Sequence, residues 1–166
     1  TGTRRWVDLP RIDGLDLSRV RTTAGDLNEG DLETAMLKAE AVHGVAQAVV
    51  RGARQDSSVR RCLVFGTTIA HAQALAEAIG VYTDPARVRA LSGRTDRDER
   101  RGILRAFTSG DVDFLCNVMV LSEGFDEPMV DMIAVARPTE SRALYSQQIG
   151  RGTRPIAPID SFDTAE

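Results

Sequence analysis

From residue 60 onward, short apolar runs alternate with longer amphipathic stretches. Short apolar runs bounded by glycine or proline are typical of buried strands, whereas apolar residues three or four positions apart are typical of helices. The pattern predicts strands over residues 61–66, 88–91, 112–119 and 130–138, and helices over residues 68–80, 97–110 and 141–154. Strands that alternate with helices in this way predict an α/β fold, a parallel β-sheet with helices on both faces.

The segment before residue 60 has a different pattern. Residues 1–30 are rich in turn formers, and one or two helices are expected across roughly residues 31–54, with Asp31 as the N-cap. Gly80 is expected to end the helix that contains residues 68–80, as a C′ glycine does. A length of 166 residues suits one domain. We therefore expect residues 1–59 to be an N-terminal extension with packing helices of the same domain, and residues 60–166 to be its core.

In parallel sheets, ligands bind beyond the carboxyl ends of the strands. The loops that follow the four predicted strands are therefore the places to look for chemistry. These loops read "GTT", "SGRTD", "LSEGFDEP" and "RPTES". The predicted helix after the second loop begins with mixed charges, "DRDERRGILR", and carries Arg100, Arg101 and Arg105. These arginines could track phosphates, but mixed signs on one helix favour a solvated, ion-paired face.

Composition excludes some functions. The chain is 42% hydrophobic and 27% charged with a net charge of −3, which is ordinary for a globular domain and gives no bulk affinity for nucleic acid. Among its 21 basic residues, Lys38 is the only lysine. A P-loop needs a lysine directly after glycine, and Lys38 lies in "AMLKAEA", so this chain cannot form a P-loop of its own.

The cysteines and histidines do not suggest a metal site. Cys62 and Cys116 are far apart and lie in apolar runs, which favours buried free thiols, and His43 and His71 have no partner at ligand spacing. No apolar run approaches the roughly 20 residues of a membrane span. We expect no metal, no membrane contact and a cytoplasmic location.

The stretch "YSQQIGRGTRP" (residues 145–155) holds two arginines at a predicted helix end. Gln147, Arg151 and Arg154 are spaced i, i+4 and i+7, so they share one helix face. Forked guanidinium groups beside small residues suit a phosphate, although a solvated arginine face would give the same pattern. In "LSEGFDEP", Asp126 could accept hydrogen bonds from ribose hydroxyls or could close an Asx turn on its own backbone.

Together these stretches resemble a known family. "CLVFGTT", "LSEGFDEP" and "QQIGRGTR", in this order and spacing, are similar to motifs IV, V and VI of the second RecA-like domain of superfamily-2 helicases. The link "ARPTESRALYSQQIGRG" most resembles RadD-like and phage or restriction-type helicases. The resemblance covers about residues 60–155 and implies the C-terminal half of an ATP-dependent helicase or translocase.

The resemblance implies a shared nucleotide site. ATP and Mg²⁺ would be held mainly by an N-terminal RecA-like domain of the same polypeptide, which makes this chain look like half of a motor. Arg151 and Arg154 match the arginines that reach the γ-phosphate, and Gln147 matches the residue that helps couple the two domains. The nucleotide-side residues implied by the resemblance are Gly124, Asp126, Gln147, Gly150, Arg151 and Arg154.

The resemblance also implies contacts with a nucleic-acid backbone, expected to be DNA. DEAD-box relatives carry threonine where Val118 aligns, so this contact could come instead from Asn117 or Ser122. The nucleic-acid-side residues implied are Gly66, Thr67, Ser92, Gly93, Arg94, Asn117 and Ser122.

Two other classes stay open. A helicase-like module kept only for docking protein or nucleic acid would not need the motif VI arginine pair. A free-standing α/β enzyme for a nucleotide or phosphorylated metabolite would need a GxGxxG-type loop, which the sequence lacks.

Overall fold

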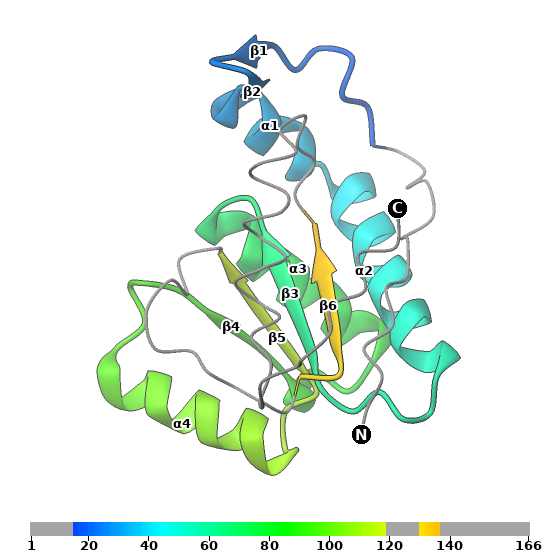
Figure 1. The fold of residues 1–166 in the computed structure, drawn as a ribbon, viewed down its shortest axis with the longest axis vertical. Coiled ribbons are helices and arrows are strands. Elements are labelled where there is room, and N and C mark those ends of the chain that lie inside the picture. Colours follow the sequence, from blue (N-terminus) through cyan, green and yellow to red (C-terminus); the bar gives the residue numbers. More distant parts are fainter. Residues whose placement is uncertain (1–14, 119–129, 137–166) are drawn as a thin grey trace, which may run out of the picture.

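The structure is a computed structural model that describes residues 15–118 and 130–136 (Figure 1). Its largest element is a four-stranded sheet with the order β4-β5-β3-β6, in which every strand pair is parallel. The predicted α/β fold is confirmed. The sheet strands are β3 (Cys62–Gly66), β4 (Val88–Leu91), β5 (Phe114–Val118) and β6 (Met132–Val135). The other elements are β1 (Thr22–Thr23), β2 (Asp26–Leu27), α1 (Glu29–Met36), α2 (Ala39–Gln55), α3 (Ile69–Tyr82), a 3₁₀ helix at Pro85–Arg87, and α4 (Arg97–Ser109).

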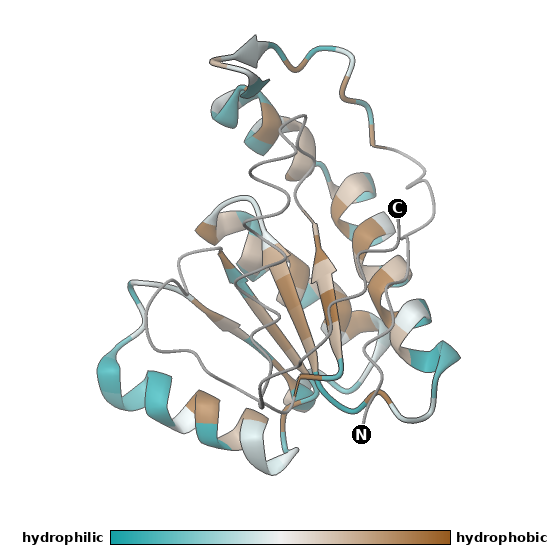
Figure 2. Ribbon diagram, viewed as in Figure 1, coloured by the Kyte–Doolittle hydropathy of each residue, from teal (hydrophilic) through white to brown (hydrophobic). Residues whose placement is uncertain are grey.

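The helices cover both faces of the sheet. Cys62 and Val64 pack in one apolar cluster with residues of α1, α2 and α3, whereas Leu63 and Phe65 pack in a second cluster with residues of α4. Successive strand residues point to opposite faces, so α4 lies across the sheet from α3. Figure 2 shows the strands β3 and β6 in mainly hydrophobic colours and the first turns of α4 in hydrophilic ones.

Several expected boundaries are wrong in detail. The N-cap of α1 is Asn28, whose Oδ1 accepts from the Asp31 amide at 3.1 Å. Asp31 lies in the first turn, and its carboxylate accepts from the Arg21 guanidinium at 2.7 Å. The helix α3 runs two residues past Gly80, to Tyr82, and its C-cap is Thr83.

Within residues 15–30, the chain forms a hairpin that the turn-rich sequence does not specify. Its strands β1 and β2 pair antiparallel, with Thr22 opposite Leu27. The two connecting residues, Ala24 and Gly25, have φ angles of 52° and 84°. Positive φ at both positions is the conformation of a type I′ hairpin turn.

Candidate functional site

The candidate site lies at the carboxyl edge of the sheet. Because β3, β4 and β5 are parallel, their carboxyl ends meet at one edge. Gly66 is paired in register with Val118, and Asn117 lies between Phe65 on β3 and Leu91 on β4. The structure therefore brings together the predicted nucleic-acid-side residues that it describes, which are Gly66, Thr67, Ser92, Gly93, Arg94 and Asn117.

Between β3 and α3 the backbone is held by a compact set of contacts. Thr68 is the N-cap of α3, and its hydroxyl accepts from the His71 amide at 3.2 Å. The Thr67 amide donates to Nδ1 of His71 at 3.0 Å. Gly66 lies so close to the helix that a Cβ there would be 3.0 Å from the amide nitrogen of Ala72 and 3.1 Å from its Cα.

Replacing Gly66 by alanine should destabilise the chain, because the obstructing atoms belong to the helix backbone and cannot rotate away. We expect a loss of about 1–3 kcal/mol in the free energy of unfolding, the usual range for overpacking. Urea denaturation measures it. Gly93→Ala is the matched control, since a Cβ at Gly93 would meet nothing within 4 Å. Equal stability of the two variants would contradict the steric account.

After β4, the loop from Ser92 to Thr95 is a closed turn. The Ser92 amide donates to Thr95 Oγ1 at 3.0 Å, and the Thr95 amide donates to the Ser92 carbonyl at 3.2 Å. Arg100 on α4 reaches the same carbonyl with Nη2 at 3.0 Å. This contact corrects the expectation that Arg100 lies on a wholly solvated face. The turn leaves Gly93 and Arg94 exposed at the edge.

Asn117 differs from these exposed residues. Its side chain is 2% exposed, and its Nδ2 has no hydrogen-bond partner among the residues that the structure describes. Its register neighbours Phe65 and Leu91 belong to the apolar cluster under α4. A buried amide without a partner is costly, so Asn117 is a polar group that this edge leaves only partly satisfied. Contact of Asn117 with nucleic acid stays a prediction.

Sequence reasoning missed His71, which is 0% exposed. Burial lowers the pKa of His71 to about 4 from its ordinary 6.5, against the opposing pull of the Glu33 carboxylate. The imidazole is therefore neutral at pH 7. The one hint in the sequence is "TTIAH", where a histidine stands three residues after Thr68, which the structure shows to be an N-cap.

The two cysteines are free and buried, as the sequence predicts. Desolvation raises the pKa of Cys62 well above its usual range and raises the pKa of Cys116 to about 12. Neither thiol is a nucleophile at neutral pH. No group of three or more potential metal ligands occurs within residues 15–118 and 130–136. Across the same residues, no helix has the length and apolar content of a membrane span.

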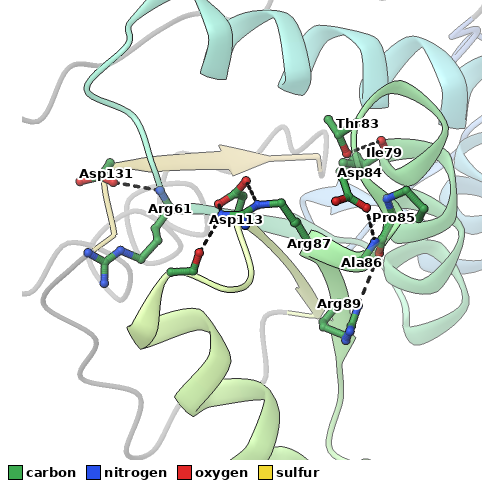
Figure 3. Close-up of polar contacts among 11 residues, drawn as sticks. Arg61, Ile79, Thr83, Asp84, Pro85, Ala86, Arg87, Arg89, Asp113 and Asp131 are labelled. Carbon is green, nitrogen blue, oxygen red and sulfur yellow. Dashed lines mark hydrogen bonds and ion pairs between the residues drawn. The ribbon is translucent and has the colours of Figure 1, made fainter.

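A pocket of about 790 Å³ opens at the opposite edge, where the sheet strands begin. Three of the arginines that line it bind other groups of the fold. Arg87 makes a bidentate ion pair with Asp113, in which Nε and Nη2 donate to the two carboxylate oxygens at 2.6 and 2.7 Å (Figure 3). Nη2 of Arg87 also donates to the Gly110 carbonyl. Arg61 and Arg54 donate to the carbonyls of Thr108 and Tyr82, both at 2.8 Å. Arg54, Arg61 and Arg87 thus bind carbonyl groups at the ends of α3 and α4, which is a structural role in the fold.

The predicted nucleotide-binding residues are not among those that the structure describes. The loop "LSEGFDEP" and the stretch "YSQQIGRGTRP" lie outside the described residues. The predicted site residues in this part of the chain are Ser122, Gly124, Asp126, Gln147, Gly150, Arg151 and Arg154.

Comparison with known proteins identifies related sequences. Residues 40–155, more than half of the chain, match the family described as the helicase conserved C-terminal domain. The chain is 34% identical, over 84% of its length, to IRC3 of Saccharomyces cerevisiae, whose name provisionally assigns it to the ATP-dependent helicases. It is 28% identical, over 90% of its length, to a 51.5 kDa protein of a Lactococcus phage. The chain spans 20% of IRC3 and 31% of the phage protein.

A solved structure has a similar fold. The Hef helicase domain of Pyrococcus furiosus matches 67% of this chain with a TM-score of 0.51. The match covers 23% of the Hef chain at 22% sequence identity. At this identity the likeness concerns the fold alone.

Proposed function

Because the chain belongs to the helicase conserved C-terminal domain family, we propose that it is the C-terminal RecA-like half of an ATP-dependent nucleic-acid helicase or translocase. The observation that carries the proposal is the carboxyl edge of the sheet. There the loops after β3 and β4 and the end of β5 come together, with the hydroxyl groups of Thr67 and Ser92 and the exposed Arg94. Such groups suit a phosphate backbone and do not read bases, as a motor that moves along any sequence requires.

On the nucleotide side, we propose that Arg151 and Arg154 complete an ATP site whose main part belongs to an N-terminal RecA-like domain. The position of Lys38 supports this division. Lys38 is the N-cap of α2 and follows the helix α1, whereas a P-loop lysine follows a strand and a glycine-rich loop. When bound, ATP with Mg²⁺ supplies the phosphoryl group that is hydrolysed. Within this chain, Gly124, Asp126, Gln147 and Gly150 would contact the nucleotide.

The isolated 166-residue chain should therefore hydrolyse no ATP above the buffer background, because it lacks the lysine that grips the β- and γ-phosphates. The intact protein should hydrolyse ATP, and nucleic acid should stimulate the reaction. Phosphate release by the two proteins, measured at equal concentration, tests this. Steady turnover by the pure fragment would contradict the proposed division of the site.

We propose DNA as the nucleic acid. The discriminating measurement is the ATPase rate of the intact protein with single-stranded DNA, double-stranded DNA and RNA of equal length. Stimulation by DNA alone supports the proposal, and stimulation by RNA alone contradicts it. The salt dependence of stimulation is a useful second readout, since backbone contacts by arginine weaken as salt rises.

A further inference from the structure

The proposed function gives no role to the buried histidine beside the carboxyl edge. The amide of Thr67 donates to Nδ1 of His71 at 3.0 Å, and an amide nitrogen can only donate. Nδ1 is therefore the unprotonated nitrogen, and the proton of the neutral ring lies on Nε2. Nε2 is buried and has no hydrogen-bond partner in the described part of the chain. Since an unpartnered N–H is costly and an apolar side chain would avoid the cost, histidine at this position needs a reason.

The reason lies in the second group that approaches the same nitrogen. Thr67 Oγ1 is also 3.0 Å from Nδ1 of His71. Nδ1 has a single lone pair, and the backbone amide already uses it. The hydroxyl hydrogen of Thr67 can therefore turn toward an acceptor outside the loop. Thr67 is half-buried and directly follows the carboxyl end of β3, so such an acceptor can approach from the edge of the sheet.

Contacts of Gly66 and Thr68 hold the backbone on either side of Thr67, so the conformation of Thr67 depends on its contact with His71. Gly66 abuts the backbone of Ala72, and the Ala72 amide donates to the Thr68 carbonyl at 2.9 Å. The hydroxyl of Thr68 holds the His71 amide. Thr67 thus lies between two anchored neighbours, and its own amide is held by His71.

We propose that His71 is a positioning residue for nucleic-acid binding: its Nδ1 holds the Thr67 amide and leaves the Thr67 hydroxyl to donate to a phosphate oxygen of the bound strand. The inference rests on the proposed function, because it needs a nucleic acid at the carboxyl edge. It extends that function by assigning a role to a residue that does not itself touch the ligand.

Two substitutions in the intact protein separate positioning from packing. In His71→Asn, the carbonyl Oδ1 lies close to the place of the imidazole Nδ1 and can accept from the Thr67 amide. In His71→Gln, the side-chain carbonyl oxygen lies one bond farther from the backbone, so it is displaced from the position of Nδ1. The measurement is ATPase rate against the concentration of a single-stranded DNA oligonucleotide, which gives the half-saturating concentration and the saturating rate separately.

We expect His71→Gln to raise the half-saturating DNA concentration about tenfold, the effect of one lost hydrogen bond, with the saturating rate within about twofold of wild type. His71→Asn should stay within about threefold of wild type for the same reason. His43→Asn is the matched control, since His43 is a half-buried histidine that binds the Tyr82 hydroxyl through Nδ1 at 2.9 Å, away from this loop.

Hydrogen exchange of the peptide that contains Thr67 gives a readout independent of activity. Exchange should be faster in His71→Gln than in wild type and near wild type in His71→Asn. If DNA stimulates the ATPase of the wild-type protein and the His71→Gln variant has the same half-saturating DNA concentration, the inference is overturned and the proposed function stands. Equal loss of affinity and saturating rate in both variants would also overturn it, as a packing effect. If nucleic acid does not change the ATPase rate of the wild-type protein, the proposed function and the inference are both overturned.

Discussion

Replacing Arg151 or Arg154 by alanine in the intact protein is expected to lower nucleic-acid-stimulated ATP hydrolysis by about 10³-fold or more. The reason is that negative charge on the transferred phosphoryl group must be stabilised in the transition state. An arginine supplied from the far side of a cleft does so only when the two domains close. In the proposed division of the site, ATP binding depends mainly on the other domain, so the affinity for a fluorescent ATP analogue should change little.

Lysine substitutions sharpen this test. Lysine keeps the positive charge but not the planar fork that binds two phosphate oxygens, so Arg151→Lys and Arg154→Lys should recover only a small part of the rate. Arg51→Ala is the control, because Arg51 is an exposed arginine on α2 that has no part in the proposed site. Unchanged turnover in both alanine variants would refute the assignment of arginine fingers.

The sheet could be predicted from the sequence because its strands are short and buried. The residues Cys62 to Phe65 form an uninterrupted apolar run that ends at Gly66, and all five are buried. Central strands of parallel sheets are covered on both faces, so their sequence shows a continuous apolar run. Once the strands were placed, the shared carboxyl edge followed from their parallel direction, and with it the proximity of Thr67, Ser92 and Asn117.

The details that the sequence did not predict depend on long-range contacts. Asn28 and Asp31 are both good N-cap residues; Asn28 is the cap in the structure, and Asp31 pairs with Arg21, ten positions away. Gly80 does not end α3. Its lack of a side chain instead lets Pro85 pack against the helix, since a Cβ at Gly80 would be 3.1 Å from the Cβ of Pro85. No local rule distinguishes such a packing glycine from a C′ glycine.

The hairpin before α1 was missed for a local reason. Its turn is formed by Ala24 and Gly25, and alanine rarely adopts a positive φ. The turn is not formed by Asn-Gly or Asp-Gly, the usual signals of a two-residue hairpin.

The role of His71 was missed because a lone histidine in an apolar helix gives no sign of its partner. Its contact with Thr67 could be inferred only from the N-cap at Thr68, which turns the backbone of the loop back toward the helix. The same burial should make the chain sensitive to acid, because it lowers the pKa of His71.

The free energy of unfolding of the chain should fall as the pH is lowered from about 6.5 to about 4. The pKa of His71 is about 4 in the folded chain and 6.5 when unperturbed, so in this range the unfolded chain binds a proton that the folded chain excludes. The stabilisation by neutral His71 is complete above pH 6.5 and is lost as the pH falls through the folded value. The total loss is about 3 kcal/mol, from 1.36 kcal/mol per pH unit. Urea denaturation followed by circular dichroism at several pH values measures it.

Variants identify the group responsible. His71→Asn cannot titrate and should flatten the profile between pH 6.5 and 4, whereas His43→Asn should keep it. Glu33→Gln should extend the loss to lower pH and enlarge its total, because the Glu33 carboxylate is the charge that favours protonation of His71. Asp16 and Asp31 have pKa values lowered by hydrogen bonds to Ser18 and Arg21, so protonation of these carboxyls destabilises the chain only at lower pH. A wild-type profile that is flat from pH 6.5 to 5 would contradict the prediction, because it would mean that the buried ring accepts a proton as readily as a histidine in water.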